Sequence, residues 1–314
     1  MRLEQIPLNR ISLRDERFRI SRFFSTGDMP RSIREFGLLS PPLVRPSGQR
    51  FVLVSGWKRV LACREIGLRR IPALITDEGD DLKAFLAVVQ ENLTHRTLSL
   101  SEKAEVLAKL MAFGQEKKAL VREQMPALSL PATASHLKSL LALSRARADV
   151  KQFAHEKDPP VGVLESLLRF GDADRTKILP LIRPLGQNKQ REVLDDLWEI
   201  GRRDRRPVRR LLERGTIGET LRSEKLPPGQ KADRVRRLLR EARYPALSSR
   251  QAAFEAALRG LGWPREIAIQ PSPYFDDEYV SVSFRFRNGD ELRRSAKKLE
   301  QLADRPGLAG LFRE

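Results

Sequence analysis

The stretch Val54-Ser55-Gly56-Trp57-Lys58-Arg59-Val60-Leu61-Ala62 joins an apolar run to a helical pattern through one glycine. Such a strand-to-helix turn leaves backbone N–H groups unpaired at the positive end of the helix dipole, and glycine lets an anion approach the backbone closely. Lys58 and Arg59 in the first helical turn are disfavoured by that dipole unless an anion supplies negative charge. The stretch predicts a phosphate-binding turn, although an ordinary strand-to-helix connection has the same pattern.

The residues around this stretch, 1–97, have the pattern of an α/β domain. Residues 42–45, 51–54 and 71–75 are short apolar runs typical of strands, and a Pro-Ser-Gly turn at 46–48 separates the first two. Residues 57–66, which end at Gly67, and residues 81–92 have helical periodicity.

Residues 98–201 are almost entirely helical in pattern, with several proline breaks. Within them, a helix over 117–125, a turn over 126–130 and a helix over 131–143 have the proportions of a helix-turn-helix. Thr133, Ser135, His136 and Lys138 would then be the polar positions available to a DNA major groove. An ordinary pair of helices in a bundle fits this pattern equally well.

The remaining residues predict two further segments. Residues 202–247 combine helical pieces with many arginines and read as a basic connector. Residues 248–314 predict a small α+β domain, in which a strand over 278–286 places Val280, Val282, Phe284 and Phe286 on one face. That face either packs in the domain's own core or joins two copies of the chain. The fold class is therefore multidomain α+β.

Charge is the strongest compositional feature. The 314 residues carry a formal net charge of +18 with a pI near 10.6, and residues 202–243 hold half of it, +9. A polyanionic partner such as DNA is the first hypothesis. The single cysteine, Cys63, excludes an intrachain disulfide and matches no zinc-ligand spacing. With no signal-peptide pattern and no long apolar run, we expect a cytoplasmic protein that does not enter the membrane.

A second polar stretch, Glu91-Asn92-Leu93-Thr94-His95-Arg96, lies at a predicted helix end. Glu91 and Asn92 have the oxygen ligands that suit Mg²⁺ carried by phosphates, and Arg96 would neutralise phosphate charge. A polar helix end before the capping pairs Ser99–Glu102 or Ser101–Glu105 is the simpler interpretation.

In this order, the segments resemble the ParB family of partition proteins. Residues 11–19 and the run Ser32 to Arg45 resemble the family's opening, with its GLLxPxxVR segment. Residues 56–62 stand where the family has GERRxxA, and Glu91-Asn92-Leu93 with the following Leu98 and Glu102-Lys103-Ala104 resembles its ENLQRxxLxxxEEA pattern. The helix-turn-helix and the C-terminal α+β domain follow in the family's order, so the resemblance extends over nearly the whole chain.

The resemblance implies a ParB-like N-terminal nucleotide-binding domain, an all-helical helix-turn-helix domain and a C-terminal dimerisation domain. It implies CTP and Mg²⁺ as cofactors, with Arg19, Gly56, Lys58, Arg59 and Arg96 at the nucleotide and Glu91 and Asn92 at the metal. The expected partners are double-stranded DNA, a second copy of the chain and a ParA-like ATPase, and the expected location is the nucleoid. The expected role is a CTP-dependent dimeric DNA clamp in chromosome or plasmid partition, with slow CTP hydrolysis as its switch.

The chain departs from the family in the nucleotide motif. Trp57-Lys58 replaces the Glu-Arg of GERR, and His95 replaces the Arg of ENLQR. These departures favour an alternative, a nucleotide-independent DNA-binding regulator on the same scaffold. A small-molecule kinase is a second alternative, because relatives of this N-terminal fold include kinases. A nuclease would need a metal–carboxylate cluster beyond Glu91 and scattered acids such as Asp77, Asp80 and Asp81, and sulfiredoxin chemistry would need a cysteine at the turn, not Cys63.

Overall fold

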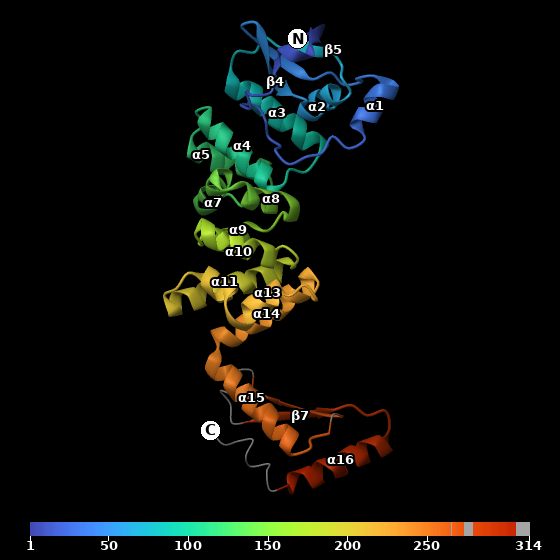
Figure 1. The fold of residues 1–314 in the computed structure, drawn as a ribbon, viewed down its shortest axis with the longest axis vertical. Coiled ribbons are helices and arrows are strands. Elements are labelled where there is room, and N and C mark those ends of the chain that lie inside the picture. The colour runs from blue at the N-terminus through green and yellow to red at the C-terminus, as the bar shows by residue number, and fades with distance from the viewer. Residues whose placement is uncertain (265, 273–278, 306–314) are drawn as a thin grey trace. The chain divides into compact units, whose positions relative to one another are not determined.

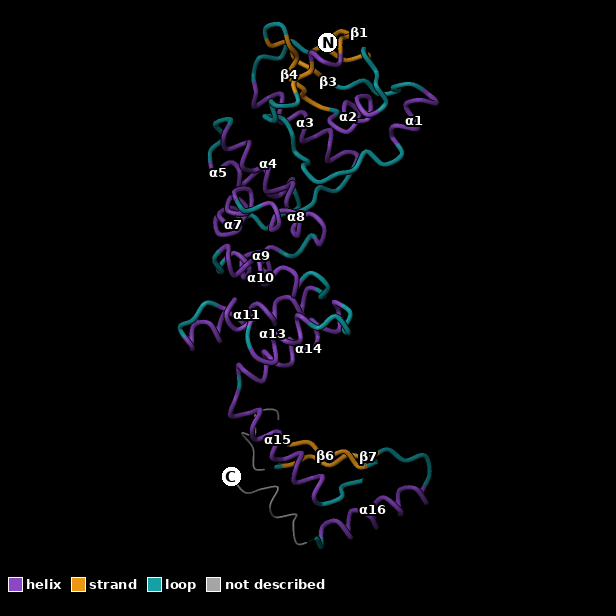
Figure 2. The backbone as a smooth tube through the Cα atoms, in the orientation of Figure 1, coloured by secondary structure: helices purple, strands orange, loops and turns teal. Residues whose placement is uncertain are grey.

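The computed structural model describes residues 1–264, 266–272 and 279–305. The chain divides into two compact units, Met1–Asp195 and Asp196–Glu314, with the boundary inside helix α11. The first unit combines a sheet with many helices, whereas the second is helical until a two-stranded ribbon near its end (Figure 1; Figure 2). The multidomain α+β fold class is thus confirmed. The four predicted segments, with boundaries at 97/98, 201/202 and 247/248, stay a prediction.

A mixed five-stranded sheet begins the first unit. Its strands are β1 (Arg2–Pro7), β2 (Ile11–Ser12), β3 (Leu43–Ser47), β4 (Arg50–Ser55) and β5 (Arg70–Ile75), in the spatial order β1-β5-β3-β4-β2. β3 pairs antiparallel with β4 and parallel with β5, and β1 pairs antiparallel with β5. The three predicted strands are present, and β1 and β2 at the two edges were not predicted.

Three helices belong to this sheet domain: α1 (Met29–Phe36), α2 (Trp57–Glu65) and α3 (Asp81–His95). The predicted helices at 57–66 and 81–92 are confirmed, and α3 runs three residues further. Asp80 starts α3 by accepting hydrogen bonds from the N–H groups of Leu82 and Lys83.

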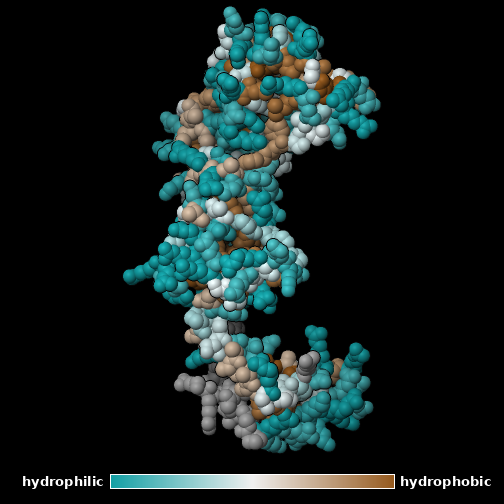
Figure 3. Space-filling model, in the orientation of Figure 1, coloured by the Kyte–Doolittle hydropathy of each residue, from teal (hydrophilic) through white to brown (hydrophobic). Residues whose placement is uncertain are grey.

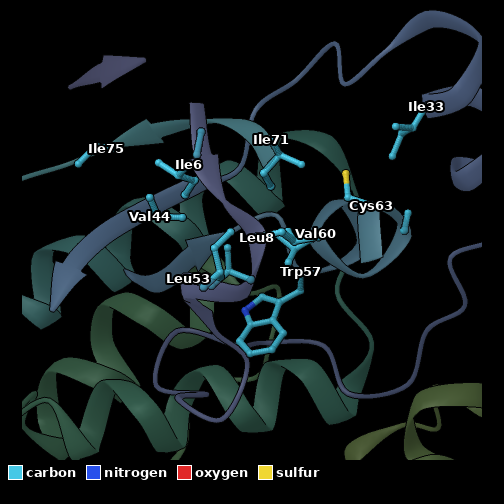
Figure 4. Packing of buried hydrophobic residues seen from close by; sticks show 13 residues of the cluster. Ile6, Leu8, Ile33, Val44, Leu53, Trp57, Val60, Cys63, Ile71 and Ile75 are labelled. Atoms are coloured by element: carbon cyan, nitrogen blue, oxygen red, sulfur yellow. The ribbon is translucent and has the colours of Figure 1, made fainter. Parts of the chain in front are cut away.

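The hydrophobic core lies between the sheet and the helices. Leu53, Val44, Ile71 and Val60 have almost no exposed surface, and Trp57 is 9% exposed. Figure 4 shows the indole of Trp57 at the edge of this cluster, beyond Leu53. The core therefore extends to the start of α2, and it fixes the glycine turn that precedes the helix.

Helices alone fill the rest of the first unit. They are α4 (Leu100–Ala112), α5 (Lys117–Ala119), a π-helical turn (Leu120–Gln124), α6 (Met125–Ala127), α7 (Ala134–Arg145), α8 (Ala148–Lys157), α9 (Val161–Leu168), α10 (Asp172–Ile182) and the first part of α11 (Gln187–Asp204). Ser99 and Glu102 form a capping box at the start of α4, which confirms the first of the two predicted capping pairs.

The predicted helix pair at 117–143 is present with shifted bounds. Residues 117–127 form one helical run that includes Pro126, which was predicted to lie in the turn. The second helix begins at Ala134, not at Pro131, because the hydroxyl of Thr133 accepts a hydrogen bond from the His136 N–H and so caps the helix there.

The second unit continues with α12 (Val208–Glu213), α13 (Gly215–Arg222), α14 (Pro228–Arg243), α15 (Pro245–Gly260), strands β6 (Ile267–Pro271) and β7 (Val280–Phe284), and α16 (Gly289–Ala303). β6 and β7 pair antiparallel. The predicted start of the second strand at Glu278 lies outside the described residues, and the predicted end at Phe286 is wrong because β7 ends at Phe284, where its pairing with β6 ends. Across the described ranges, none of the helices combines the length and apolar character needed to cross a bilayer.

The apolar face predicted for the strand at 278–286 is not fully covered, and its last residue, Phe286, lies two residues beyond the end of β7. Val282 is 43% exposed and Phe286 is 52% exposed, while Val280 and Phe284 are partly buried. The small core of this part is made by Phe254, Ile267 and Leu302 instead. A two-stranded ribbon is marginal by itself in water, so this face gains stability from whatever covers it.

Candidate functional site

Gly56 forms the turn between β4 and α2. Its φ of +100° lies in the region that disfavours residues with a Cβ, and a Cβ at this position would stand 2.8 Å from the Cβ of Pro42. Gly56 is also the N-cap residue of α2, and no side chain caps the helix there. The positive end of this helix is therefore available to an anion.

A cavity of about 400 Å³ opens at this turn. Six of the seven residues predicted for the nucleotide and metal sites line it: Gly56, Lys58, Arg59, Glu91, Asn92 and Arg96. The other wall is apolar and includes Phe18, Phe24, Trp57 and Val88. The fold thus brings together two stretches that are 35 residues apart, and it combines a charged wall with an aromatic one.

Arg59 and Glu91 form an ion pair in the lining of the cavity. The Arg59 Nη2 lies 3.8 Å from Glu91 Oε1, and Glu91 Oε2 accepts a hydrogen bond from the Ser55 hydroxyl at 2.7 Å. Arg59 Nη1 donates to the Ser40 carbonyl (2.9 Å), the Ser40 hydroxyl (2.7 Å) and the Pro41 carbonyl (3.1 Å). Burial lowers the pKa of Arg59, and the charge of Glu91 opposes that shift. Arg59 is therefore held firmly, with one edge directed to Glu91.

Arg96 is held by protein groups. Its guanidinium donates to both oxygens of Glu102, at 2.9 and 3.0 Å, to the Ser21 hydroxyl and to the Asn92 side-chain oxygen. Burial favours a higher pKa for Glu102, but hydrogen bonds from Ser21 and Ser99 and the charge of Arg96 lower it overall. Arg96 thus joins α3, α4 and the 18–24 segment, and Glu102 neutralises its charge.

Arg19 lies near the cavity without lining it. Its guanidinium stands over the Trp57 ring, 4.8 Å from the ring centroid, and 5.6 Å from that of Phe24. Lys58 Nζ approaches the same Phe24 ring at 5.4 Å. These cation–π contacts place two cations beside the aromatic wall. The Trp57 indole N–H is buried and has no hydrogen-bond partner among the described residues.

The two predicted metal ligands differ in how well they suit Mg²⁺. Glu91 presents one carboxylate to the cavity and is 45% exposed, which suits a cation that keeps most of its waters and phosphate ligands. The Asn92 amide is engaged within α3, since its nitrogen donates to the Val88 carbonyl and its oxygen accepts from Arg96. Glu91 is therefore the better ligand.

Two of the acids considered for nuclease chemistry, Asp80 and Asp81, have structural roles, and the cysteine considered for sulfiredoxin chemistry is buried. Asp80 caps α3, and Asp81 pairs with Arg17 and Arg45. Within the described ranges, no cluster of three or more His, Cys, Asp or Glu side chains is arranged to hold a metal. Cys63 is completely buried in α2, and burial raises the pKa of its thiol.

Helix α7 presents the predicted DNA-contacting residues unequally. Ser135 and Lys138 are exposed, and the inward face carries Leu137, Leu140 and Leu141. The Thr133 hydroxyl is occupied as the helix cap and also lies 2.9 Å from His136 Nδ1. The exposed side chains of Ser135 and Lys138 are therefore available to a ligand, whereas those of Thr133 and His136 already contact each other.

Sequence reasoning missed two residues in these regions. Ser55 ends β4 and anchors Glu91, and its place directly before the glycine was the available signal. Arg145 is exposed at the end of α7, seven residues after Lys138 and so two turns along the same face.

The class of protein that this geometry indicates is an α/β domain in which a strand-to-helix glycine turn opens into a cavity lined by basic side chains. Comparison with known families makes the class specific, because residues 2–93 match the family described as the ParB N-terminal domain. Residues 2–93 are therefore a ParB N-terminal domain, and the predicted relationship to the ParB family is confirmed there.

Relatives agree with that family. The chain is 38% identical over 116 residues to a chromosome-partitioning protein Spo0J of Thermus thermophilus. The aligned region covers 37% of this chain and 43% of that protein. It is 39% identical over 90 residues to a probable chromosome 1-partitioning protein ParB of Deinococcus radiodurans, and this match covers 29% of this chain and 31% of that protein. The chain thus spans less than half the length of these relatives.

A solved structure of similar description also aligns with the chain. It is a C-terminally truncated chromosome-partitioning protein ParB from Caulobacter crescentus complexed with CTP-γ-S, 24% identical, covering 54% of this chain and 99% of that one, with a TM-score of 0.28. That TM-score is too low to compare residue positions between the two proteins.

Proposed function

We propose that this chain is a ParB-like DNA-binding protein whose N-terminal cavity binds a nucleoside triphosphate, CTP, together with Mg²⁺. The observation that carries the proposal is the cavity itself. An uncapped helix start behind Gly56, the cations of Lys58 and Arg59, and the carboxylate of Glu91 converge there. These groups match a phosphate chain and its metal.

Each group has a distinct role in this proposal. The backbone N–H groups after Gly56 would donate hydrogen bonds to phosphate oxygens, and Lys58 and Arg59 would neutralise the phosphate charge. Glu91 would hold Mg²⁺ through one carboxylate oxygen, and the cation supplies further neutralisation of the phosphates. Arg96 would act indirectly, because its guanidinium already binds Glu102 and Asn92. Arg19 would support the aromatic wall that faces the rest of the nucleotide.

The test is equilibrium binding of radiolabelled CTP, ATP, GTP and UTP with Mg²⁺ to the full chain, with and without DNA. Arg59→Ala should weaken CTP binding about tenfold to a hundredfold, because it removes a charge-assisted contact worth about 1.5–3 kcal/mol. Arg64→Ala removes an exposed arginine from the same helix, outside the cavity, and should leave binding unchanged. Lys58→Ala is a second variant, because Arg59 also supports the segment at Ser40 and Pro41.

The outcomes separate three functions. CTP-selective, Arg59-dependent binding supports the proposal, and DNA-stimulated CTP hydrolysis, measured in parallel by phosphate release, would strengthen it. Selective ATP binding favours the kinase. Binding of no nucleotide by a folded, DNA-binding protein favours the nucleotide-independent regulator, which the Trp57-Lys58 replacement already suggests.

DNA recognition is proposed for α7. Ser135 and Lys138 are exposed on it, and Thr133 with His136 fixes its first turn. Lys138→Ala with His136→Ala should reduce discrimination between a selected DNA sequence and random duplex more than it reduces total affinity. Lys157→Ala, an exposed lysine at the end of α8, is the control. Equal losses on both DNAs would contradict base reading by α7.

Self-association is proposed for the C-terminal module. The support is the incompletely covered face of β7, where Val282 is 43% exposed, together with Phe286 just beyond the strand, which is 52% exposed. Val282→Glu should shift the full chain from dimer to monomer in sedimentation equilibrium. Ser283→Glu, on the opposite face of the same strand, should not. A role in DNA partition with a ParA-like ATPase is part of the same proposal, and co-sedimentation with such an ATPase tests it.

A further inference from the structure

The hydroxyl of Ser55 holds Glu91 in the wall of the cavity. Ser55 is the last residue of β4, its exposed fraction is 7%, and it pairs with Leu43 of β3 in the sheet. The sheet therefore fixes its position, whereas Glu91 belongs to helix α3. The Ser55 Oγ donates a hydrogen bond of 2.7 Å to Glu91 Oε2. A hydrogen bond to an ionised carboxylate is among the stronger ones in proteins, so this contact ties the carboxylate to the end of β4.

The other oxygen of the same carboxylate lies near Arg59. The distance from Glu91 Oε1 to Arg59 Nη2 is 3.8 Å, which is too long for a hydrogen bond. An arginine and a carboxylate that can approach each other freely often form two parallel hydrogen bonds of about 2.7–2.9 Å. The bond from Ser55 occupies one of the two carboxylate oxygens that such a pair would use. Glu91 is thus kept apart from a guanidinium that it would otherwise bind.

Of these two charged groups, Arg59 is the more firmly held. Its Nη1 donates hydrogen bonds to the carbonyl and hydroxyl of Ser40 and to the carbonyl of Pro41. Its side chain is 21% exposed, whereas that of Glu91 is 45% exposed. A carboxylate released from Ser55 would therefore move to the guanidinium, because the guanidinium is already fixed and the carboxylate is not.

The apolar wall of the cavity strengthens the attraction between Arg59 and Glu91. Phe18 and Val88 line the cavity together with these two residues, and charges beside apolar groups are screened less than charges in water. On the visible face of the sheet domain, hydrophobic patches adjoin hydrophilic side chains (Figure 3). A closed pair would occupy the guanidinium that phosphate needs and the carboxylate that a cation needs. A hydroxyl that holds the carboxylate back therefore keeps both groups available.

We propose that Ser55 is a positioning residue that keeps Glu91 from closing on Arg59. It leaves the carboxylate available to a divalent cation and the guanidinium available to phosphate. The proposal rests on the proposed function, because a phosphate chain and its metal are the ligands that need these two groups. Ser55 acts through Glu91 and does not itself have to contact the ligand.

The test is calorimetric titration of the full chain with inorganic triphosphate, first with EDTA and then with Mg²⁺. Binding that persists in Arg59→Ala is subtracted, because it arises elsewhere on a basic protein. With EDTA, Ser55→Ala should weaken binding about tenfold, since the released carboxylate occupies the guanidinium. Glu91→Ala should have the opposite effect and strengthen binding about fivefold, since it removes a negative charge 3.8 Å from that guanidinium.

The double variant Ser55→Ala, Glu91→Ala isolates the positioning role. It should bind triphosphate as Glu91→Ala alone does, because Ser55 acts only through that carboxylate. With Mg²⁺, Ser55→Ala should gain less affinity than the wild-type chain gains. The matched control is Ser47→Ala, because Ser47 ends the neighbouring strand β3, is exposed and lies outside the cavity lining. It should bind as the wild-type chain does, and circular dichroism verifies that each variant folds.

Wild-type affinity in Ser55→Ala overturns the proposal, and so does an equal loss in Ser47→Ala. A loss from Ser55→Ala that persists in the absence of Glu91 also overturns it, because Ser55 would then be a direct ligand or a part of the fold alone. The same titrations with CTP distinguish this failure from failure of the proposed function. Ser55-dependent triphosphate binding without CTP binding would contradict the proposed CTP site and support this proposal. CTP binding that is independent of Ser55 would contradict this proposal alone, and a wild-type chain that binds neither ligand contradicts both.

Discussion

Replacing Gly56 by alanine tests the glycine turn on which the candidate site depends. At a φ of +100° an L-residue pays about 1–2 kcal/mol for a conformation that glycine adopts freely. The new Cβ would also stand 2.8 Å from the Pro42 Cβ and 3.0 Å from its Cα, so backbone must move, and such overpacking costs about 1–3 kcal/mol. Gly56→Ala should therefore lower the free energy of unfolding of the sheet domain by about 2–5 kcal/mol.

Two other glycines separate these contributions. Gly48 has a φ of +59° and nothing within 4 Å of an added Cβ, so Gly48→Ala carries only the conformational cost. Gly79 has neither a positive φ nor a close neighbour, so Gly79→Ala should be neutral or slightly stabilising through the unfolded chain.

The assay is hydrogen exchange of peptides from β4 and α2 at increasing urea, which gives a local unfolding free energy in the full chain. The local unfolding free energy should be highest in Gly79→Ala, lower in Gly48→Ala and lowest in Gly56→Ala. If Gly56→Ala and Gly48→Ala agree within about 0.5 kcal/mol, the close approach of Pro42 contributes nothing and the reasoning is refuted.

Three further predictions concern titratable groups that are buried or partly buried. Glu102 has a pKa below its usual 4.5, so the stability that it contributes is present above pH 4.5 and is lost as the pH falls through its folded pKa. Glu102→Gln should therefore make the urea midpoint less dependent on pH between about pH 5 and 3, and an unchanged pH dependence would contradict this. Burial lowers the pKa of Lys109 to about 8, so between pH 8 and 10.5 the unfolded chain binds more protons than the folded chain, and the free energy of unfolding should rise with pH. Lys109→Met should abolish this rise, and a rise that persists in the variant would exclude Lys109 as its source. Cys63 should react with iodoacetamide at pH 8 only after unfolding, and rapid labelling of the native chain would disprove its burial.

Local sequence patterns predicted the sheet domain well where they carried strong periodicity. The strands at 43–47, 50–55 and 70–75 and helices α2 and α3 follow apolar runs and capping residues that are visible without a structure. β1 and β2 were missed because edge strands need little apolar character, and pairing with β5 and β4 defines them. The start of α7 was misplaced because a proline was preferred over the actual cap, Thr133.

The candidate site was predictable in its composition but not in its contacts. The glycine turn and the stretch at residues 91–96 were both identified, and the fold places them around one cavity. Sequence alone could not show that Arg96 binds Glu102, because that pairing depends on how α4 follows α3. It also could not show that Arg19 stacks on Trp57, which requires the 18–24 segment to cross the start of α2.

The charges in the cavity explain why the replacement at Trp57-Lys58 need not abolish anion binding. An indole in place of a carboxylate removes a negative charge from the first turn of α2, and Lys58 retains a cation there. Glu102 neutralises the charge of Arg96, so Arg96 adds little to the positive potential in the cavity. The net charge that a phosphate would meet there therefore depends on Lys58, Arg59 and Glu91. Glu91 stands 3.8 Å from Arg59, so it competes with an incoming phosphate for that guanidinium. A divalent cation on Glu91 would weaken this competition, and phosphate binding in this cavity should therefore depend strongly on the metal.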